Sequence, residues 1–294
     1  MKLRDSYHVY AFITVVFWSL AYVFSRLAMQ HFSPYPLGFL RYITASAFLV
    51  FVVVFKKIKP PEIKDMPWFA VSGAAGFFIY MLTFNKGTGM VPSATSSVII
   101  ATAPIMTALM ARVVYKEKLK VHQWAATGIE FFGIIVLTLM GGDFAVNEGI
   151  IWLLMAAFSL SVYNLLQRKM TKMYEPLRVT AYSIFFGTAM LCIFAGDACR
   201  EAASASLDQF VNILVLGVLS SALAYISWAK AFSKAENTSS VSNYMFVTPF
   251  ITAVFGFVFA GEVPDAATVV GGGIIMCGVF LFFKDNFFKQ KETK

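Results

Sequence analysis

Charged side chains are scarce in this sequence. Asp, Glu, Lys and Arg make up 14% of its 294 residues, whereas 59% of the residues are hydrophobic. An average soluble domain is about 25% charged. So little charge leaves too little polar surface to face water, which excludes an ordinary soluble domain. The composition instead predicts a chain surrounded by lipid.

Histidine and cysteine are also rare, and their positions argue against several kinds of site. The three histidines, His8, His31 and His122, lie near the ends of apolar runs, so no histidine metal cluster is expected at membrane depth. The three cysteines, at positions 192, 199 and 277, have no paired spacing, which argues against a disulfide framework or a cysteine metal motif. We therefore expect neither a metal nor another cofactor.

Common catalytic and nucleotide-binding motifs are missing as well. The chain has no His-Glu-x-x-His, no paired intramembrane aspartates, no Ser–His arrangement at depth and no Gly-Lys-Ser/Thr P-loop. These absences argue against a membrane-embedded enzyme and against direct coupling to ATP. The net charge of +8 lies in short loops between apolar runs, so we expect no nucleic-acid partner despite the basic balance.

Long apolar runs fill the rest of the sequence, and ten of them are long enough to cross a bilayer. Prolines at 34, 36, 60, 61 and 176 and glycines at 141 and 142 separate several of these runs, because neither residue continues a helix well. The first run is too long for the core of a signal peptide, so we interpret it as a retained helix. The predicted spans are 8–30, 36–55, 67–86, 92–114, 121–140, 148–168, 177–196, 208–231, 237–260 and 265–284. The sequence therefore predicts an all-α membrane protein with ten transmembrane helices.

The basic residues are divided unequally between the two sides of such a bundle. With the N-terminus in the cytoplasm, 20 of the 24 Lys and Arg residues fall on the cytoplasmic side. The four exceptions are Arg26, Arg41, Lys86 and Arg200. Because short cytoplasmic loops are enriched in Lys and Arg, this pattern predicts cytoplasmic N- and C-termini. We expect a multi-pass protein of the cytoplasmic (inner) membrane of a prokaryote.

The sequence also repeats itself. A shift of 145 residues aligns 80–136 with 225–281 without a gap and gives ten identities, among them Tyr80 with Tyr225 and Pro104 with Pro249. A shift of 142 aligns Ser19 with Ser161, Arg26 with Arg168 and Pro34 with Pro176. The chain thus divides into two five-helix halves, residues 1–145 and 146–294. Five is an odd number, so the second half must enter the membrane from the opposite side, which makes an inverted-topology repeat.

Several of these stretches resemble a known family. They are Phe17-Trp18-Ser19, Leu40-Arg41, the segments 103–117 and 248–262, and the glycine pairs 128/133 and 273/278. On these residues the sequence is similar to the drug/metabolite transporter superfamily, in its EamA-type branch. The resemblance implies a carrier that works by alternating access, with a central cavity lined by helices one to four and six to nine and with helices five and ten at the periphery. Members of that family move amino acids, nucleotide-related metabolites, sugar phosphates or organic cations, so the resemblance does not identify the solute.

Candidate binding residues are aromatic and polar groups that share helix faces at membrane depth. Polar groups there are costly unless they pair or line a wet cavity, although packing or an interfacial aromatic belt could also explain individual members. The set is Trp18, Tyr22, Tyr80, Phe84, Asn85, Ser97, Tyr163, Asn164, Gln167, Tyr225, Trp228, Ser242, Asn243 and Tyr244. We further predict that Pro104 and Pro249 kink the middle of their helices and act in gating, with a static kink as the alternative.

Four ionisable residues within or at the ends of the spans need separate interpretation. We expect Arg26, Arg41 and Lys86 to extend to the nearby membrane surface. Glu130 lies about nine residues into the fifth span, beside the bulky Phe131. We predict that it is a protonated acid in a structural contact with a second helix, which Gly128 and Gly133 would allow to approach. A role in ion coupling is the alternative.

The functional expectation is a carrier for a small amphipathic metabolite, such as an amino acid or a related solute, acting in export or exchange. An organic-cation or drug carrier of the same fold is the first alternative; a membrane-embedded enzyme and a non-transporting scaffold are more distant ones. The expected partners are the solute and the lipid bilayer. Coupling to an ion such as a proton stays open. We expect a monomer, with a dimer as the alternative.

Overall fold

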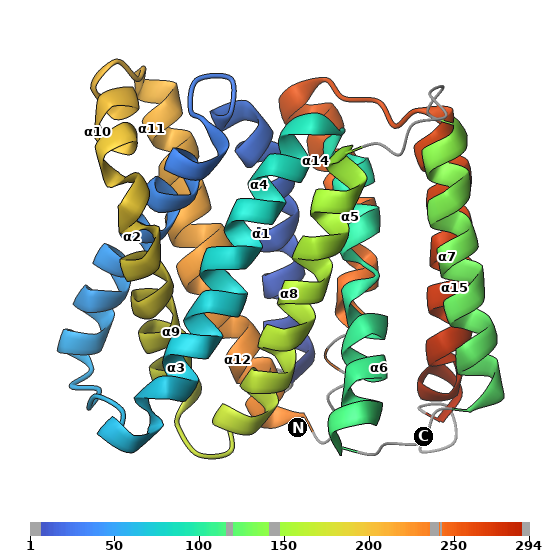
Figure 1. Ribbon diagram of the computed structural model, residues 1–294, viewed down its shortest axis with the longest axis horizontal. Coiled ribbons are helices and arrows are strands. Elements are labelled where there is room, and N and C mark those ends of the chain that lie inside the picture. Colours follow the sequence, from blue (N-terminus) through green and yellow to red (C-terminus); the bar gives the residue numbers. More distant parts are fainter. Residues whose placement is uncertain (1–6, 116–119, 141–147, 236–240, 242, 290–294) are drawn as a thin grey trace.

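Helices form nearly all of the described chain (Figure 1), which in this computed structural model comprises residues 7–115, 120–140, 148–235, 241 and 243–289. The first half contains α1 (Tyr7–Ala28), α2 (Pro34–Phe55), η2 (Ile63–Asp65), α3 (Met66–Gly73), η3 (Ala74–Ile79), α4 (Tyr80–Met90), α5 (Ser93–Ile100), α6 (Ala103–Tyr115) and α7 (Val121–Met140). The second contains α8 (Glu148–Met170), α9 (Pro176–Leu191), η4 (Cys192–Phe194), α10 (Ala195–Ala203), α11 (Leu207–Leu214), η5 (Val215–Leu223), α12 (Ala224–Lys234), η6 (Asn243–Val247), α14 (Thr248–Ala260) and α15 (Ala266–Lys289).

These elements join end to end into ten helical segments among the described residues, which confirms the predicted fold. Each predicted span coincides with one segment, and most ends agree within a few residues. Seven of the segments are long and apolar enough to cross a membrane by themselves, and shorter apolar helices lie at Thr248–Ala260 and Ala266–Phe282. The segments run side by side through the bundle (Figure 1), as they must when each spans the same layer.

Two segments contain π-helical turns that the sequence analysis did not predict. η3 lies between α3 and α4, and η5 lies between α11 and α12. A shift of 145 residues places the first on residues 219–224, so the two turns occupy equivalent places in the two halves. π-helical turns inside α-helices are often found at functional sites.

The predicted proline kinks take a different form. The fourth segment is interrupted at Ala101 and Thr102, and Pro104 is the second residue of the new helix α6. Pro249 is likewise the second residue of α14, which follows the 3-10 turn η6. Proline is well tolerated in the first turn of a helix because the N–H that it lacks would have no helical acceptor there. Pro104 and Pro249 therefore begin helices after a break and do not bend continuous ones.

A tight turn follows α14 and redirects the chain. Gly261 has a φ of 64°, the left-handed conformation that glycine adopts most easily. The N–H of Glu262 donates to the carbonyl of Gly256 at 3.0 Å, and the N–H of Gly261 donates to that of Phe257 at 3.2 Å. These bonds end the helix as glycine caps commonly do. They also hold Glu262 over the last turn of α14.

Helices α7 and α15 form a close pair at one side of the bundle (Figure 1). A Cβ atom on Gly133 would lie 2.8 Å from the backbone nitrogen of Ile275, and one on Gly278 would lie 2.9 Å from the carbonyl oxygen of Ala126. Neither Gly128 nor Gly273 has an atom of a neighbouring element within 4 Å of such a Cβ. The close approach that we predicted at both glycines of the fifth span thus occurs at Gly133 and not at Gly128.

Candidate functional site

A small cavity lies inside the bundle. Its lining includes residues of α1 and α2, of α4 and α12 after the two π-helical turns, and of the broken segments α5–α6 and η6–α14. Its volume is about 10 Å³ for the centre of a water-sized sphere, which is room for about one water molecule. The described conformation is therefore closed around the cavity. Its lining consists of Trp18, Ala21, Tyr22, Arg41, Tyr80, Phe84, Ser97, Ile100, Ala101, Leu160, Tyr225, Met245 and Thr248.

Aromatic rings form much of the wall. The ring centroid of Trp18 lies 5.2 Å from that of Tyr225, and Phe84 lies 5.3 Å from both Tyr22 and Tyr80. Such edge-to-face and offset pairs contribute about 0.5–1.5 kcal/mol each beyond the area they bury. The wall is therefore both apolar and held in shape by ring contacts.

The π-helical turns and the helix breaks position the lining residues. Tyr80 is the first residue after η3, and Tyr225 is the second residue after η5. Ala101 lies in the break before α6, and Thr248 begins α14. The cavity thus lies where helices of both halves depart from regular geometry, as the binding sites of carriers with discontinuous helices do.

Two equivalent serines connect the halves at these breaks. The hydroxyl of Ser161 on α8 donates to the carbonyl oxygen of Ala103 at 2.9 Å, and that of Ser19 on α1 donates to the carbonyl oxygen of Thr248 at 3.3 Å. The first bond joins α8, the first helix of the second half, to the start of α6 in the first half. The second joins α1, the first helix of the first half, to the start of α14 in the second half. The repeat that aligned Ser19 with Ser161 therefore has a structural counterpart.

The expectation that Arg41 extends to the membrane surface is wrong. Its side chain is 2% exposed and lines the cavity. The Nε–H donates to the hydroxyl oxygen of Ser221 at 2.7 Å, and Nη2–H donates to the carbonyl oxygen of Ser220 at 3.4 Å. Arg41 lies seven residues after Pro34, a depth of about 10 Å along the helix axis. The sequence indicates that depth, although it does not indicate the direction in which the side chain points.

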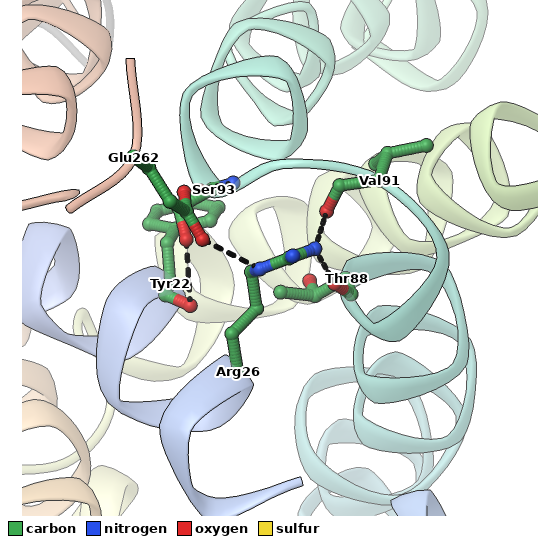
Figure 2. A network of polar contacts seen from close by, with 6 residues as sticks. All are labelled: Tyr22, Arg26, Thr88, Val91, Ser93 and Glu262. Atoms are coloured by element: carbon green, nitrogen blue, oxygen red, sulfur yellow. Dashed lines mark hydrogen bonds and ion pairs between the residues drawn. The ribbon is translucent and has the colours of Figure 1, made fainter. Parts of the chain in front are cut away.

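A polar network centred on Arg26 closes the end of the bundle opposite the start of α1. Nε of Arg26 forms an ion pair with Oε1 of Glu262 at 2.6 Å. The Nη1 group donates to the carbonyl oxygens of Val91 at 2.5 Å and Thr88 at 3.3 Å (Figure 2). Arg26 therefore joins α1 to the end of α4 and to the turn after α14. Its side chain is 32% exposed in the last turn of α1, as expected for a side chain that extends toward the nearby surface, but it is paired with Glu262.

The same network includes the start of α5. The backbone N–H of Ser93 donates to Oε2 of Glu262 at 2.9 Å, and its hydroxyl donates to the carbonyl oxygen of Tyr22 at 3.4 Å (Figure 2). Glu262 thus bonds to Arg26 and to a helix N-terminus, where a negative charge is stabilised. We call Arg26, Thr88, Val91, Ser93 and Glu262 the Arg26 network.

Comparison with known proteins assigns the family. Residues 5–139 and 147–284 each match the EamA-like transporter family. The chain belongs to this family. It is therefore a multi-pass membrane protein of a family of transporters.

Individual relatives of this EamA-like transporter also span most of its length. The "Uncharacterized transporter YdfC" of Bacillus subtilis (strain 168) is 28% identical, with 92% of this chain and 88% of the relative aligned. A "Probable terminal-alkyne amino-acid exporter" of Streptantibioticus cattleyicolor is 29% identical, with 100% and 98% aligned. An "S-adenosylmethionine uptake transporter" of Rickettsia prowazekii (strain Madrid E) is 24% identical, with 93% and 91% aligned.

A solved structure supports the fold of this EamA-like transporter. It superimposes with a TM-score of 0.65 at 16% sequence identity and covers 93% of this chain and 96% of its own. At that identity the similarity shows the arrangement of the helices and nothing about the solute.

Some predicted site residues of this EamA-like transporter lie behind the cavity wall. Trp228 is fully buried, with its ring centroid 4.8 Å from that of Trp18, and its Nε1–H donates to Oδ1 of Asn164 at 3.5 Å. The Nδ2 group of Asn85 donates to the carbonyl oxygen of Pro34 at 2.8 Å. These residues support lining residues and neighbouring helices and do not themselves line the cavity.

The remaining predicted site residues differ in their placement. Tyr163 packs with its ring centroid 5.7 Å from that of Tyr225, and Gln167 is buried on the same helix. Tyr244 lies beside His8, with 2.5 Å between its hydroxyl oxygen and Nδ1 of that histidine, at the end where α1 begins. Ser242 and the side chain of Asn243 lie outside the described residues. The predicted residues that line the cavity are Trp18, Tyr22, Tyr80, Phe84, Ser97 and Tyr225.

Glu130 lies apart from this cavity, on the close pair of helices. It is 3% exposed, and its Cγ would be 2.7 Å from a Cβ atom on Gly278. It lines a second cavity of about 20 Å³ together with residues of α6 such as Ile105 and Met106. Its Oε1 has no hydrogen-bond partner among the described residues. Across the part of the chain described here, no three His, Cys, Asp or Glu side chains gather as a metal site would require.

Proposed function

We propose that this EamA-like transporter is a carrier that moves a small amphipathic metabolite, such as an amino acid or a related solute, across the cytoplasmic membrane. It does so by alternating access, in export or exchange. The observation that supports this most strongly is the buried aromatic cavity at the breaks of two equivalent helices. Broken helices of inverted repeats commonly form the substrate site of secondary transporters.

The lining suits a solute that is mainly apolar but carries a few polar groups. Trp18 and Phe84 present apolar surface, whereas Nε1 of Trp18 and Oγ1 of Thr248 are buried without a hydrogen-bond partner among the described residues. Buried polar atoms are stabilised when a ligand supplies their missing partner. The names of two relatives, an amino-acid exporter and an S-adenosylmethionine uptake transporter, also support a small metabolite as the solute.

The closed conformation suits alternating access. The cavity has room for about one water molecule, so a solute must enter through a rearrangement. The Arg26 network closes one end with contacts from four separate segments. When the contacts of the Arg26 network break, solute can reach the cavity from this end of the bundle. When they form, solute can reach the cavity only from the opposite end.

Counterflow in reconstituted vesicles tests this proposal. Vesicles loaded with an unlabelled amino-acid mixture should transiently accumulate labelled amino acid from outside, because a carrier exchanges one solute for another. Tyr225→Ala should lower this accumulation, since it removes part of the wall, while an exposed substitution such as Phe257→Ala should not. If folded protein gives no counterflow with any metabolite of a broad panel, the carrier proposal is wrong.

A further inference from the structure

A guanidinium group in the cavity wall has no acidic partner in the described structure. Arg41 donates to Ser221 at 2.7 Å and to Ser220 at 3.4 Å, and its Nη1 lies 3.9 Å from Sδ of Met81. None of these groups is an anion, and no Asp or Glu contacts Arg41 among the described residues. Charges at membrane depth are costly and mark functional sites in most cases.

Part of the hydrogen-bonding capacity of this guanidinium is unused. The group has five N–H donors in a planar fork. The contacts to Ser221, Met81 and Ser220 use one N–H on each nitrogen, which leaves one on Nη1 and one on Nη2 without an acceptor in the described chain. Two donors on one guanidinium can together contact the two oxygens of a carboxylate.

We propose, on the basis of the carrier function above, that Arg41 binds the solute through a carboxylate. The cavity would then take a small organic acid with one negative charge and an apolar body. Among the described residues that line the cavity, Arg41 is the one cationic side chain, and none is an acid. A monoanion neutralises that charge, a dianionic phosphate leaves an excess negative charge, and a purely cationic solute adds a second positive charge at low dielectric.

The rest of the lining fits the remainder of such a solute. The rings of Tyr22 and Phe84 offer apolar surface to its body. An additional ammonium group, as in an amino acid, can lie against the faces of Trp18 and Tyr225 through cation–π attraction. The carboxylate is therefore the required group, and the ammonium is an optional one.

Three molecules of similar shape test this on the purified wild-type protein. They are 3-phenylpropanoate, its neutral amide 3-phenylpropanamide, and the cation 2-phenylethylamine. A ligand that binds the folded form raises the unfolding temperature. We expect the acid to raise it and the amide and amine to have little effect. Equal stabilisation by the amide or the amine overturns the proposal, as does no stabilisation by the acid at about 10 mM.

Substitution of Arg41 then assigns the effect to this side chain. Arg41→Gln should weaken binding of 3-phenylpropanoate about tenfold to hundredfold, the usual effect of losing charge-assisted hydrogen bonds. Arg41→Lys keeps the positive charge without the planar pair of donors, so its affinity for 3-phenylpropanoate should lie between those of the wild type and Arg41→Gln. If Arg41→Gln does not fold, Arg41→Lys takes its place in the test. The control is Arg200→Gln, which removes an exposed arginine from α10. Unchanged binding in both Arg41 variants contradicts the proposal.

Counterflow separates this inference from the carrier proposal. If the wild type carries a solute equally well in its acid and amide forms, the carrier function stands and the role of Arg41 is wrong. If the wild type carries nothing but binds 3-phenylpropanoate in an Arg41-dependent way, the carboxylate site stands and the carrier function is wrong.

Discussion

Glu130 shows how one polar group can be accommodated in an apolar contact between two helices. It is 3% exposed on α7, and it lies directly against Gly278 of α15. The glycine leaves space that any larger side chain would fill. Oε1 of Glu130 has no hydrogen-bond partner among the described residues, so a bond from the neutral acid across the contact stays a prediction. Such a bond suits a structural role at the periphery better than a role in each transport cycle.

We predict that Glu130→Gln keeps most transport and leaves its pH dependence unchanged, because the amide has the same shape and can also donate. Glu130→Leu should lower the free energy of unfolding by about 1 kcal/mol, the scale of one interhelical hydrogen bond. Vesicle transport across a pH series and thermal unfolding measure the two effects. Loss of proton-driven accumulation in Glu130→Gln, with exchange retained, would instead identify Glu130 as the coupling site.

Arg41 shows the limit of reading single residues from the sequence. Composition and loop position suggested a side chain that reaches the surface, whereas the structure buries it in the cavity wall. Hydropathy gives the depth of a residue along a helix but not the direction in which its side chain points. Its partners Ser220 and Ser221 are about 180 positions away in the chain, so no local pattern could have indicated them.

At the scale of elements, the pair α7 and α15 depends on two glycines. The missing side chains of Gly133 and Gly278 let each helix approach the backbone of the other. Gly128 and Gly273 occupy equivalent positions five residues earlier but face open space. The four glycines looked alike in the sequence, and the rotation of each helix about its axis separates them into two classes.

Substitution of these glycines by alanine should therefore have unequal effects. We predict that Gly278→Ala lowers the free energy of unfolding by about 1–3 kcal/mol, because the added methyl group meets a backbone carbonyl that cannot move aside easily. Gly273→Ala should be neutral or stabilise by up to about 1 kcal/mol, since alanine favours the helix. Denaturant or thermal unfolding of both purified variants measures the two changes in the free energy of unfolding. Equal destabilisation would show that the packing of this pair is described wrongly.

The extent of each helical segment could be predicted from hydropathy and proline position, but its internal irregularities could not. The π-helical turns η3 and η5 contain ordinary helix-forming residues such as Ala74 and Leu216. Such turns are short departures within otherwise α-helical segments, and hydropathy does not distinguish them from regular helix. The breaks beside Pro104 and Pro249 were partly foreseen, since proline marked both positions, although its place in the first turn of a new helix was not.

At the scale of the whole molecule, the repeat is what connects sequence to mechanism. The two shifts that align the halves relate Tyr80 to Tyr225 in the cavity wall and Ser19 to Ser161, whose hydroxyls bond to the helix breaks. They also relate Pro104 to Pro249, which follow those breaks. Bonds such as Ser19 to Thr248 cross between halves and join residues 229 positions apart. The sequence could therefore predict which residues are equivalent, but not which of them touch.

The orientation of this bundle stays a prediction, based on the distribution of 20 of the 24 basic residues. Lys59 and Ser204 are exposed in connections at opposite ends of the bundle. In a variant without native cysteines, Ser204→Cys should react with a membrane-impermeant thiol reagent added to whole cells, and Lys59→Cys should react only after lysis. The reverse pattern would invert the proposed topology.

The central claim is that solute reaches the cavity through alternate opening of the two ends. The Arg26 network provides a place to block one of them. In a variant without native cysteines, Arg26→Cys and Glu262→Cys would be joined by a short bifunctional thiol reagent whose disulfide links can be reduced. Each single-cysteine variant, treated in the same way, controls for the modification itself.

The measurement is solute exchange in reconstituted vesicles before linking, after linking and after reduction. Alternating access predicts that exchange falls to the level of protein-free vesicles when the end is held closed, and returns when the links are reduced. Undiminished exchange by fully linked protein would contradict the account, because solute would then cross without opening this end of the bundle.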